Sequence, residues 1–187
     1  MLEDLEQRTG LPEYLLVLRA KYPREMWQGH TNFNELTAFW LERHGMFRQV
    51  LDRLVAESCE FLDGRAPRYG VEMSRFTGFL LNQLHGHHGI EDAHYFPMFR
   101  KLDARLQRGF DLLDGDHHAL HDHMAQLAQQ SNAVLEAMRA EQHVLTHDRA
   151  GQLLEVQQSF QTFLTRHLED EEDLVVPLVL EYGADMS

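Results

Sequence analysis

The stretch that decides the fold of this chain is His87-His88-Gly89-Ile90-Glu91-Asp92-Ala93-His94-Tyr95-Phe96-Pro97. Residues 167–177, HLEDEEDLVVP, repeat its pattern H-x-x-x-E-[D/E]-x-x-x-x-P. Residues four apart lie on one face of an α-helix, so each copy directs an imidazole and a carboxylate at one point. A chain with 13 His gives about one H-x-x-x-E match by chance, but the shared acid and proline argue against coincidence. The repeat is typical of a metal site inside a helix bundle.

Composition limits the class of protein. The chain has 187 residues, 43% of them hydrophobic and 25% charged, which fits one globular domain. The net charge of −13 argues against nucleic acid or an anionic membrane as a partner. No apolar run approaches the ~20 residues of a membrane span, and the acidic N-terminus lacks a secretory signal, so we expect a cytoplasmic protein. Cys59 is the single cysteine and excludes an intrachain disulfide.

Apolar residues recur at helical spacing in four segments, and no segment has a strand pattern. The expected helices cover residues 34–62, 71–97, 110–139 and 147–182. Pro97 is expected to kink or end the second helix, and residues 99–106 to form a short connecting turn. Four long amphipathic helices with short connections predict an all-α fold, an antiparallel up-down-up-down four-helix bundle.

Residues 1–33 are expected to be a short N-terminal helical extension, and residues 34–187 the bundle. The extension contains an apolar helix candidate at residues 11–18, which begins with a proline and stops before Pro23. We expect it to lie as a strap across one end of the bundle. A regulatory segment, or one that forms a homodimer, is the alternative.

The bundle divides into two similar halves that share one ligand pattern. Each half offers one inward histidine on its first helix and an H-x-x-x-E pair on its second. The predicted metal ligands are therefore His44, His87 and Glu91 from the first half, and His117, His167 and Glu171 from the second, with His121 as a seventh. Within the acidic run 169–173, Glu169, Asp170 and Asp173 are expected to face solvent, and only Glu171 to point inward.

The ligand count limits the metal. Six or seven ligands are too many for one tetrahedral zinc, and calcium and magnesium prefer oxygen donors. Imidazole with carboxylate suits iron, with manganese or zinc as alternatives. Two metal ions fit better than one, because Glu91 and Glu171 can each bridge a pair, and the odd histidine leaves one metal with an open position. A ferritin-like site is disfavoured, since it uses Glu-x-x-His and more carboxylates.

These motifs resemble the hemerythrin family, in its HHE cation-binding branch, over residues 34–182. The matching elements are Glu42-Arg43-His44, His87-x-x-x-Glu91-Asp92 with Phe96-Pro97, Asp116-His117 with His121, and His167-x-x-x-Glu171-Glu172 with Pro177. The resemblance implies a di-iron site with bridging carboxylates that binds dioxygen reversibly, or senses oxygen, nitric oxide or iron. In hemerythrin proper the last motif resembles H-x-x-x-x-D, which would select Glu172, whereas helical phase favours Glu171.

Other residues near the motifs have supporting interpretations. His85, His88 and His94 flank the second-helix motif, and Asp116 and Asp122 either accept a hydrogen bond from a ligand histidine or are solvated surface acids. Apolar residues within a turn of the ligands, among them Ile90 and Leu120, are expected to pack in the core, and some to form a dry pocket at the open metal position.

Three functions follow from this pattern. The first is a non-catalytic di-iron protein that binds or senses dioxygen or another small diatomic ligand. The second is a non-haem di-iron redox enzyme acting on peroxide or nitric oxide, which ranks lower because the sequence adds no clear proton donor or electron-transfer partner. The third is an interaction module in which the metal only stabilises the bundle.

Overall fold

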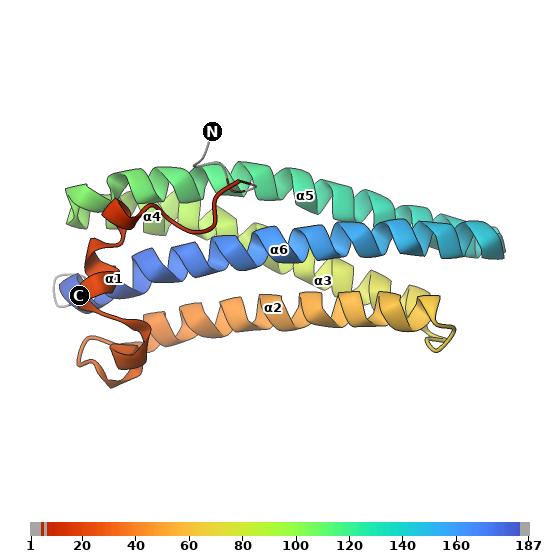
Figure 1. Cartoon of the computed structure of the whole chain (residues 1–187), viewed down its shortest axis with the longest axis horizontal. Helices are drawn as coiled ribbons and strands as arrows, with labels where there is room; N and C mark the ends of the chain where they lie inside the picture. The colour runs from red at the N-terminus through yellow and green to blue at the C-terminus, as the bar shows by residue number, and fades with distance from the viewer. Residues whose placement is uncertain (1–4, 6, 184–187) are drawn as a thin grey trace. The chain divides into compact units, whose positions relative to one another are not determined.

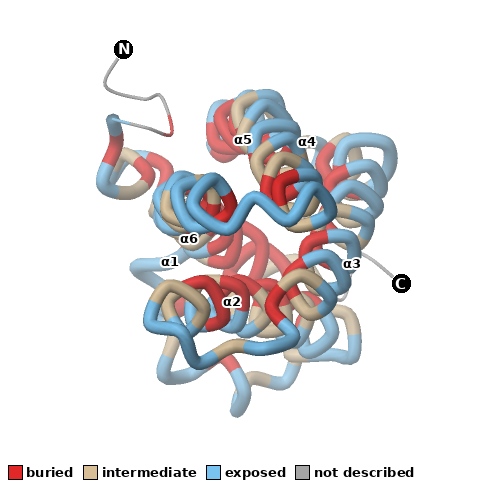
Figure 2. The backbone as a smooth tube through the Cα atoms, turned by 90° about the vertical axis from the view of Figure 1, so that its right-hand side faces the viewer, coloured by how far each residue is buried: buried red, intermediate tan, exposed pale blue. Residues whose placement is uncertain are grey.

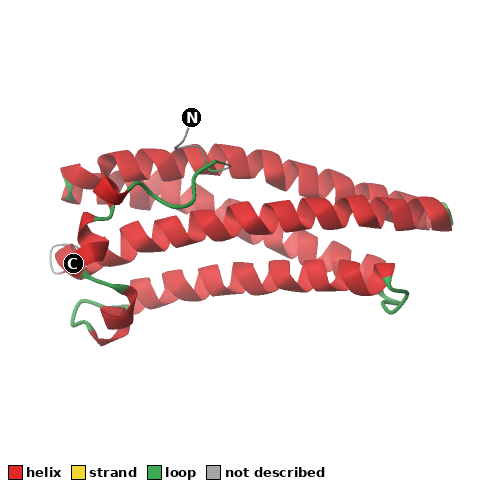
Figure 3. Cartoon of the chain, in the orientation of Figure 1, coloured by secondary structure: helices red, strands yellow, loops and turns green. Residues whose placement is uncertain are grey.

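A computed structural model describes residue 5 and residues 7–183 of the chain. Within these residues helices are the only regular elements (Figure 3). The all-α prediction is therefore confirmed. The long helices are α2 (Glu35–Leu62), α3 (Tyr69–Ile90), α5 (Gln107–Arg139) and α6 (His143–Tyr182), and the short ones are α1 (Val17–Lys21) and α4 (Phe96–Leu102), all labelled in Figure 1. Short 3₁₀ turns cover Glu13–Leu15, Arg24–Gly29 and Ala104–Leu106.

Two compact units share the long helices. The first unit comprises residues 1–45, 88–118 and 165–187, of which the described part holds α1, α4 and one section of each long helix. The second comprises residues 46–87 and 119–164, with the remaining sections of the same four helices. Figure 2 shows buried positions recurring along each helix between exposed ones, which is the amphipathic pattern read from the sequence.

Local chemistry accounts for the helix ends. At the start of α2, the side-chain oxygen of Asn34 accepts a hydrogen bond from the Thr37 backbone N–H at 3.1 Å, and the Thr37 hydroxyl accepts from the Asn34 N–H at 2.9 Å. This reciprocal cap satisfies donors that a helix N-terminus leaves free. After α2, Gly64 turns the chain with a φ of 75°, a left-handed conformation that favours glycine.

The second long helix differs from its prediction near Pro97. The helical conformation does not end there, because a π-helical segment, Glu91–Tyr95, follows α3 directly and leads into α4. Pro97 lies in the first turn of α4, where its missing N–H costs nothing. The N–H of Phe96 bonds to the carbonyl of Glu91, five residues back. Residues 99–106 are thus not a simple turn, since α4 extends to Leu102.

The N-terminal segment is broken rather than a single helix over residues 11–18. A 3₁₀ turn, Glu13–Leu15, precedes α1, and Tyr22 and Pro23 end α1. The segment lies along α6, as Figure 1 shows for α1 and the C-terminal part of α6. Lys21 Nζ and the Tyr22 hydroxyl both donate to Glu181 Oε2, at 2.5 and 2.6 Å.

Each unit has its own buried apolar side chains. In the first unit, aromatic rings from α2, α4 and α5 meet: Phe99 lies 6.0 Å from Trp40 and 5.8 Å from Phe110 between ring centroids. Apolar residues of the N-terminal segment and of α6 complete this core, which contains Leu11, Leu15, Leu18, Trp40, Phe96, Phe99, Leu106, Phe110, Leu112, Leu113, Leu174, Val175, Leu178 and Val179. Buried apolar residues of the second unit include Phe47, Leu54, Met73, Leu80, Leu127, Leu153 and Phe160.

Replacing Phe99 by alanine should lower the free energy of unfolding by about 3–5 kcal/mol, because it empties a fully buried ring position. The matched control is Phe39→Ala on α2, which removes the same atoms from a ring that is 57% exposed and should cost less than about 1 kcal/mol. Urea unfolding of both metal-free variants measures the difference. Equal costs would contradict the placement of Phe99 in the core.

Candidate metal centre

Two glutamates lie at the centre of a polar cluster inside the first unit. Glu91 is the first residue of the π-helical segment, Glu171 lies on α6, and both have no exposed surface. Burial, and then repulsion from Glu171, raise the pKa of Glu91 well above its ordinary value. Two neighbouring carboxylates in a dry interior need positive charge or protons between them.

Three imidazoles direct a ring nitrogen at these carboxylates. The two oxygens of Glu171 face different histidines: Oε1 lies 3.5 Å from His44 Nε2, and Oε2 lies 3.4 Å from His167 Nε2. Glu91 Oε2 lies 3.6 Å from His117 Nε2. These histidines come from α2, α5 and α6, so the cluster joins elements far apart in the sequence.

The opposite ring nitrogen of each imidazole donates to a second carboxylate. The pairs, measured from Nδ1 to the carboxylate oxygen, are His44 with Glu172 at 3.0 Å, His117 with Asp92 at 2.7 Å, and His167 with Asp116 at 3.1 Å. A carboxylate accepts, so Nδ1 carries a proton, and Nε2 is the nitrogen that faces the cluster and can offer its lone pair to a metal once it is deprotonated. This is the tautomer and orientation that a metal ligand needs.

The pKa shifts differ among the histidine–carboxylate pairs. Burial alone would lower the pKa of His167, but the hydrogen bond of its ring to Asp116 and the nearby carboxylate of Glu171 raise it to about 9. Burial would raise the pKa of Asp116, yet hydrogen bonds donated by Arg8 and His167 keep it below its ordinary value. For His117 burial dominates, and its pKa lies below the usual value despite the bond to Asp92.

His88 joins this cluster although the sequence pattern gave it only a flanking place. It is fully buried, and its ring stacks on that of His117 with 4.0 Å between centroids. Ring nitrogens of His88, His117 and His167 all lie within 4.8 Å of one another. A signal was available in the sequence: His88 precedes Glu91 by three residues, and residues three apart also share a helix face.

His87 and His121 are the two remaining predicted ligands. His87 is half-buried, lies one helical turn before Glu91, and its ring is 5.1 Å from that of Phe47 in the second unit. His121 is exposed, with its ring 5.5 Å from that of His85. The structure therefore does not bring His121 into a His/carboxylate group within the described residues, and its role as a ligand remains a prediction.

The acidic run on α6 is not the solvated surface that the sequence indicated. Asp170 is only 4% exposed and accepts hydrogen bonds from Arg8 and from the Leu11 backbone N–H. Glu172 is also buried and faces away from the carboxylate cluster, on Nδ1 of His44, whereas Glu171 faces Nε2 of the same ring. Glu169 is exposed, as predicted.

The structure also decides two other expectations in the same region. Of the two alternatives for Asp116, it confirms the hydrogen-bond acceptor and not the solvated surface acid, since Asp116 is 3% exposed and bonded to Arg8 and His167. Ile90 is 51% exposed and cannot line a dry pocket. Asp122 is exposed, as a surface acid would be.

Trp40 also contacts the cluster directly. Its indole N–H donates to Glu171 Oε1, and its ring lies 5.0 Å from that of Tyr95, edge to face. The bond fixes one lone pair of Glu171 and turns the other oxygen toward His167. Tyr95, in the π-helical segment, is half-buried.

The donor set fits a metal ion. Nε2 of His117 and Nε2 of His167 are buried, and neither makes a hydrogen bond within the described residues. Two donors on one metal at bonds of about 2.1 Å lie roughly 3.0–3.5 Å apart, which is close to the observed nitrogen–oxygen separations. Imidazole and carboxylate together suit iron, manganese or zinc.

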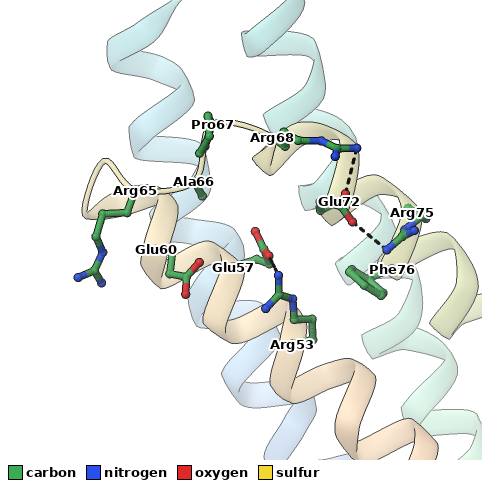
Figure 4. A pocket seen from close by; sticks show the side chains of 10 residues that line it. All are labelled: Arg53, Glu57, Glu60, Arg65, Ala66, Pro67, Arg68, Glu72, Arg75 and Phe76. Atoms are coloured by element: carbon green, nitrogen blue, oxygen red, sulfur yellow. Dashed lines mark hydrogen bonds and ion pairs between the residues drawn. The ribbon is translucent and has the colours of Figure 1, made fainter.

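A charged pocket elsewhere has no such chemistry. Figure 4 shows a pocket of about 470 Å³ in the second unit, lined by four arginines and three glutamates together with Ala66, Pro67 and Phe76. Its charges already neutralise one another, since Arg53 is paired with Glu57, and Glu72 with both Arg68 and Arg75. The buried histidine cluster is therefore the candidate site.

Comparison with known proteins identifies the class. An all-helical chain with buried His/Glu groups is a metal-binding helical protein, and residues 35–179 match the hemerythrin HHE cation binding domain. The chain belongs to the hemerythrin HHE cation-binding family. Neither a curated protein nor a solved structure matches it. In the described part of the chain, none of the helices is long and apolar enough to cross a membrane.

Metal loading should release protons at pH 7. Ligands bind metals in their deprotonated form, whereas the raised pKa of His167, about 9, and of Glu91 keep protons on the metal-free cluster. We expect at least about one proton per chain, read as a dependence of the calorimetric binding heat on the ionisation enthalpy of the buffer. The release from His167 should vanish at pH 10. Identical heats in all buffers at pH 7 would contradict the protonated cluster.

Replacing His88 should weaken metal binding, and replacing His121 should not. His88→Gln removes a nitrogen that lies among those of His117 and His167, so we expect a loss of affinity of about tenfold or more. His121→Gln changes an exposed side chain in the same way and serves as the matched control. Competition with a chromophoric chelator measures both variants. A loss confined to His121→Gln would overturn this assignment.

Proposed function

We propose that this protein holds two iron ions in the buried cluster and binds dioxygen or a related diatomic ligand there. The observation that carries the proposal is the placement of Glu171, whose two oxygens face Nε2 of His44 on one side and Nε2 of His167 on the other. A carboxylate that serves two imidazoles in this way is suited to bridge two metals. A pair of ferrous ions would supply the electrons for reversible dioxygen binding.

The two metal positions would be unequally supplied with ligands. His88, His117 and His167 provide three nitrogens on one side. On the other side His44 is joined, in this proposal, by His87, which precedes Glu91 by one turn of continuous helix. Glu91 and Glu171 would serve both. The position with fewer imidazoles is the one we propose for the diatomic ligand.

The surroundings favour binding over turnover. The cluster residues Glu91, His44, His167 and Glu171 have no exposed surface, which keeps bulk water and protons away from the ligand position. The proposal includes the antiparallel up-down-up-down bundle and a cytoplasmic location, where dioxygen and iron are both accessible. Manganese or zinc are the alternative ions.

One contact favours a second candidate, a redox enzyme acting on peroxide or nitric oxide. Trp40 donates to Glu171 and touches the ring of Tyr95, so two oxidisable aromatic side chains adjoin the cluster. Such rings could deliver electrons to a bound substrate. Steady consumption of peroxide or nitric oxide with an added reductant would favour this function over reversible binding.

The decisive measurement is the metal content together with the absorption spectrum of an anaerobic, reduced sample before and after air is admitted. We expect about two irons per chain and new charge-transfer bands that fade when oxygen is removed. Glu171→Ala, which removes the bridging carboxylate, should lose the bands and most of the iron, while His121→Gln keeps both. A wild-type protein with one zinc or no stoichiometric metal would overturn the proposal.

A further inference from the structure

The N-terminal segment delivers an arginine to a carboxylate that orients a cluster histidine. Arg8 is 7% exposed, and its Nη1 donates to Asp116 Oδ1 at 2.7 Å. Asp116 Oδ2 accepts in turn from His167 Nδ1 at 3.1 Å. The Nε of Arg8 is bound at 2.9 Å to Asp170, which holds the guanidinium flat against both acids. A chain of two hydrogen bonds thus connects residue 8 to a proposed metal ligand.

A second arginine of the same segment repeats the arrangement on another histidine. Arg24 Nη1 donates to Glu172 Oε2 at 2.8 Å, and Glu172 Oε1 accepts from His44 Nδ1 at 3.0 Å. His44 and His167 are the two imidazoles that face opposite oxygens of Glu171. The two hydrogen-bond chains therefore end at the two histidines that flank Glu171, the carboxylate proposed to bridge the metals.

The third orienting acid shows why arginines are needed at the other two. Asp92 orients His117, and its side chain is 39% exposed, so water stabilises its charge. The side chains of Asp116 and Glu172 are each only 4% exposed. A buried carboxylate without a countercharge would be protonated or would turn away. Arg8 and Arg24 supply the charge that water supplies to Asp92.

We infer that residues 8–24, here called the strap, position and tune the metal centre through Arg8 and Arg24, so that strap docking and metal binding reinforce each other. The inference rests on the proposed metal site. Arg8 and Arg24 are positioning residues, since each acts on a histidine through a carboxylate. Because linkage is reciprocal, a metal that is bound more tightly with the strap in place also holds the strap more tightly.

The strap has other contacts that fix it without touching an orienting acid, and these provide the control. Arg19 Nε pairs with Asp173 at 2.7 Å, and Lys21 pairs with Glu181 at 2.5 Å. Neither acid bonds to a cluster histidine in the described contacts. Loss of the Arg19 pair weakens docking only at the surface, where such pairs contribute little.

The test compares Arg8→Gln and Arg24→Gln with Arg19→Gln in the full-length chain. Cobalt(II) is the probe, titrated against a chromophoric chelator, and its visible spectrum is recorded for each variant. We expect the first two variants to bind cobalt about 10–100-fold more weakly, with shifted absorption bands, because the imidazoles lose their fixed orientation. Arg19→Gln should stay within about twofold of wild type, and Arg8→Lys should recover part of the loss.

A second readout guards against variants that simply unfold. Trypsin cleaves after Arg19 and Lys21, whose side chains are 43% and 56% exposed. In the wild-type protein cobalt should slow this cleavage several-fold, and Asp116→Asn, which keeps Arg8 and its bond to Asp170 but breaks its link to His167, should reduce the protection. Circular dichroism of the metal-free samples checks that each variant is folded.

The outcomes distinguish a failure of the coupling between strap and metal from a failure of the proposed metal site itself. Equal cobalt affinity and equal spectra in wild type, Arg8→Gln and Arg24→Gln, with cleavage independent of the metal, would overturn the coupling and leave the metal site standing. A wild-type chain that binds no cobalt, iron or zinc would overturn both.

Discussion

The first unit is organised by the burial of two carboxylates. Glu91 and Glu171 lie where no water reaches them, and a charge in such a place must be matched by another charge, a proton or a metal. Three imidazoles and the indole of Trp40 direct nitrogens at them, and each of these three imidazoles is held by a further acid on its far side. Two of those acids are themselves buried and require arginines. Each shell of polar groups thus calls for the next: glutamates for histidines, histidines for acids, and buried acids for arginines. Together these groups make up most of the buried polar residues described in this unit.

Sequence periodicity predicted the four long helices because their apolar residues recur at a spacing that only a helix satisfies. The ends were less certain, since α5 begins at Gln107 and α6 at His143, a few residues before the apolar repeat becomes visible. The π-helical segment could not be predicted. Pro97 indicated that the backbone would be irregular nearby, but a proline is compatible with a kink, a stop or a wider turn.

Histidines that differ by one position show the limit of pattern reasoning for the site. The i,i+4 rule selected His87 and passed over the buried His88, although residues three before a glutamate share its face as well. The same rule added His121 to His117. On α5, however, Leu113, Leu120 and Met124 mark the buried side, and His121 follows Leu120 by about 100°, which turns it toward solvent. Apolar neighbours locate the inner face better than the spacing between ligands.

The five acids at residues 169–173 have partners in the folded chain that the sequence did not reveal. A run of like charges on a helix is unfavourable unless cations or solvent offset it. Here Arg8 pairs with Asp170, Arg24 with Glu172, and Arg19 with Asp173, while Glu171 turns inward and Glu169 outward. The strap and the acidic run are thus two halves of one electrostatic arrangement. The sequence alone does not show that the two are paired, because the cations lie some 150 residues from the acids along the chain. That separation is why the sequence indicated a solvated face, and why the folded chain can use the same acids to hold its N-terminal segment and its histidines at once.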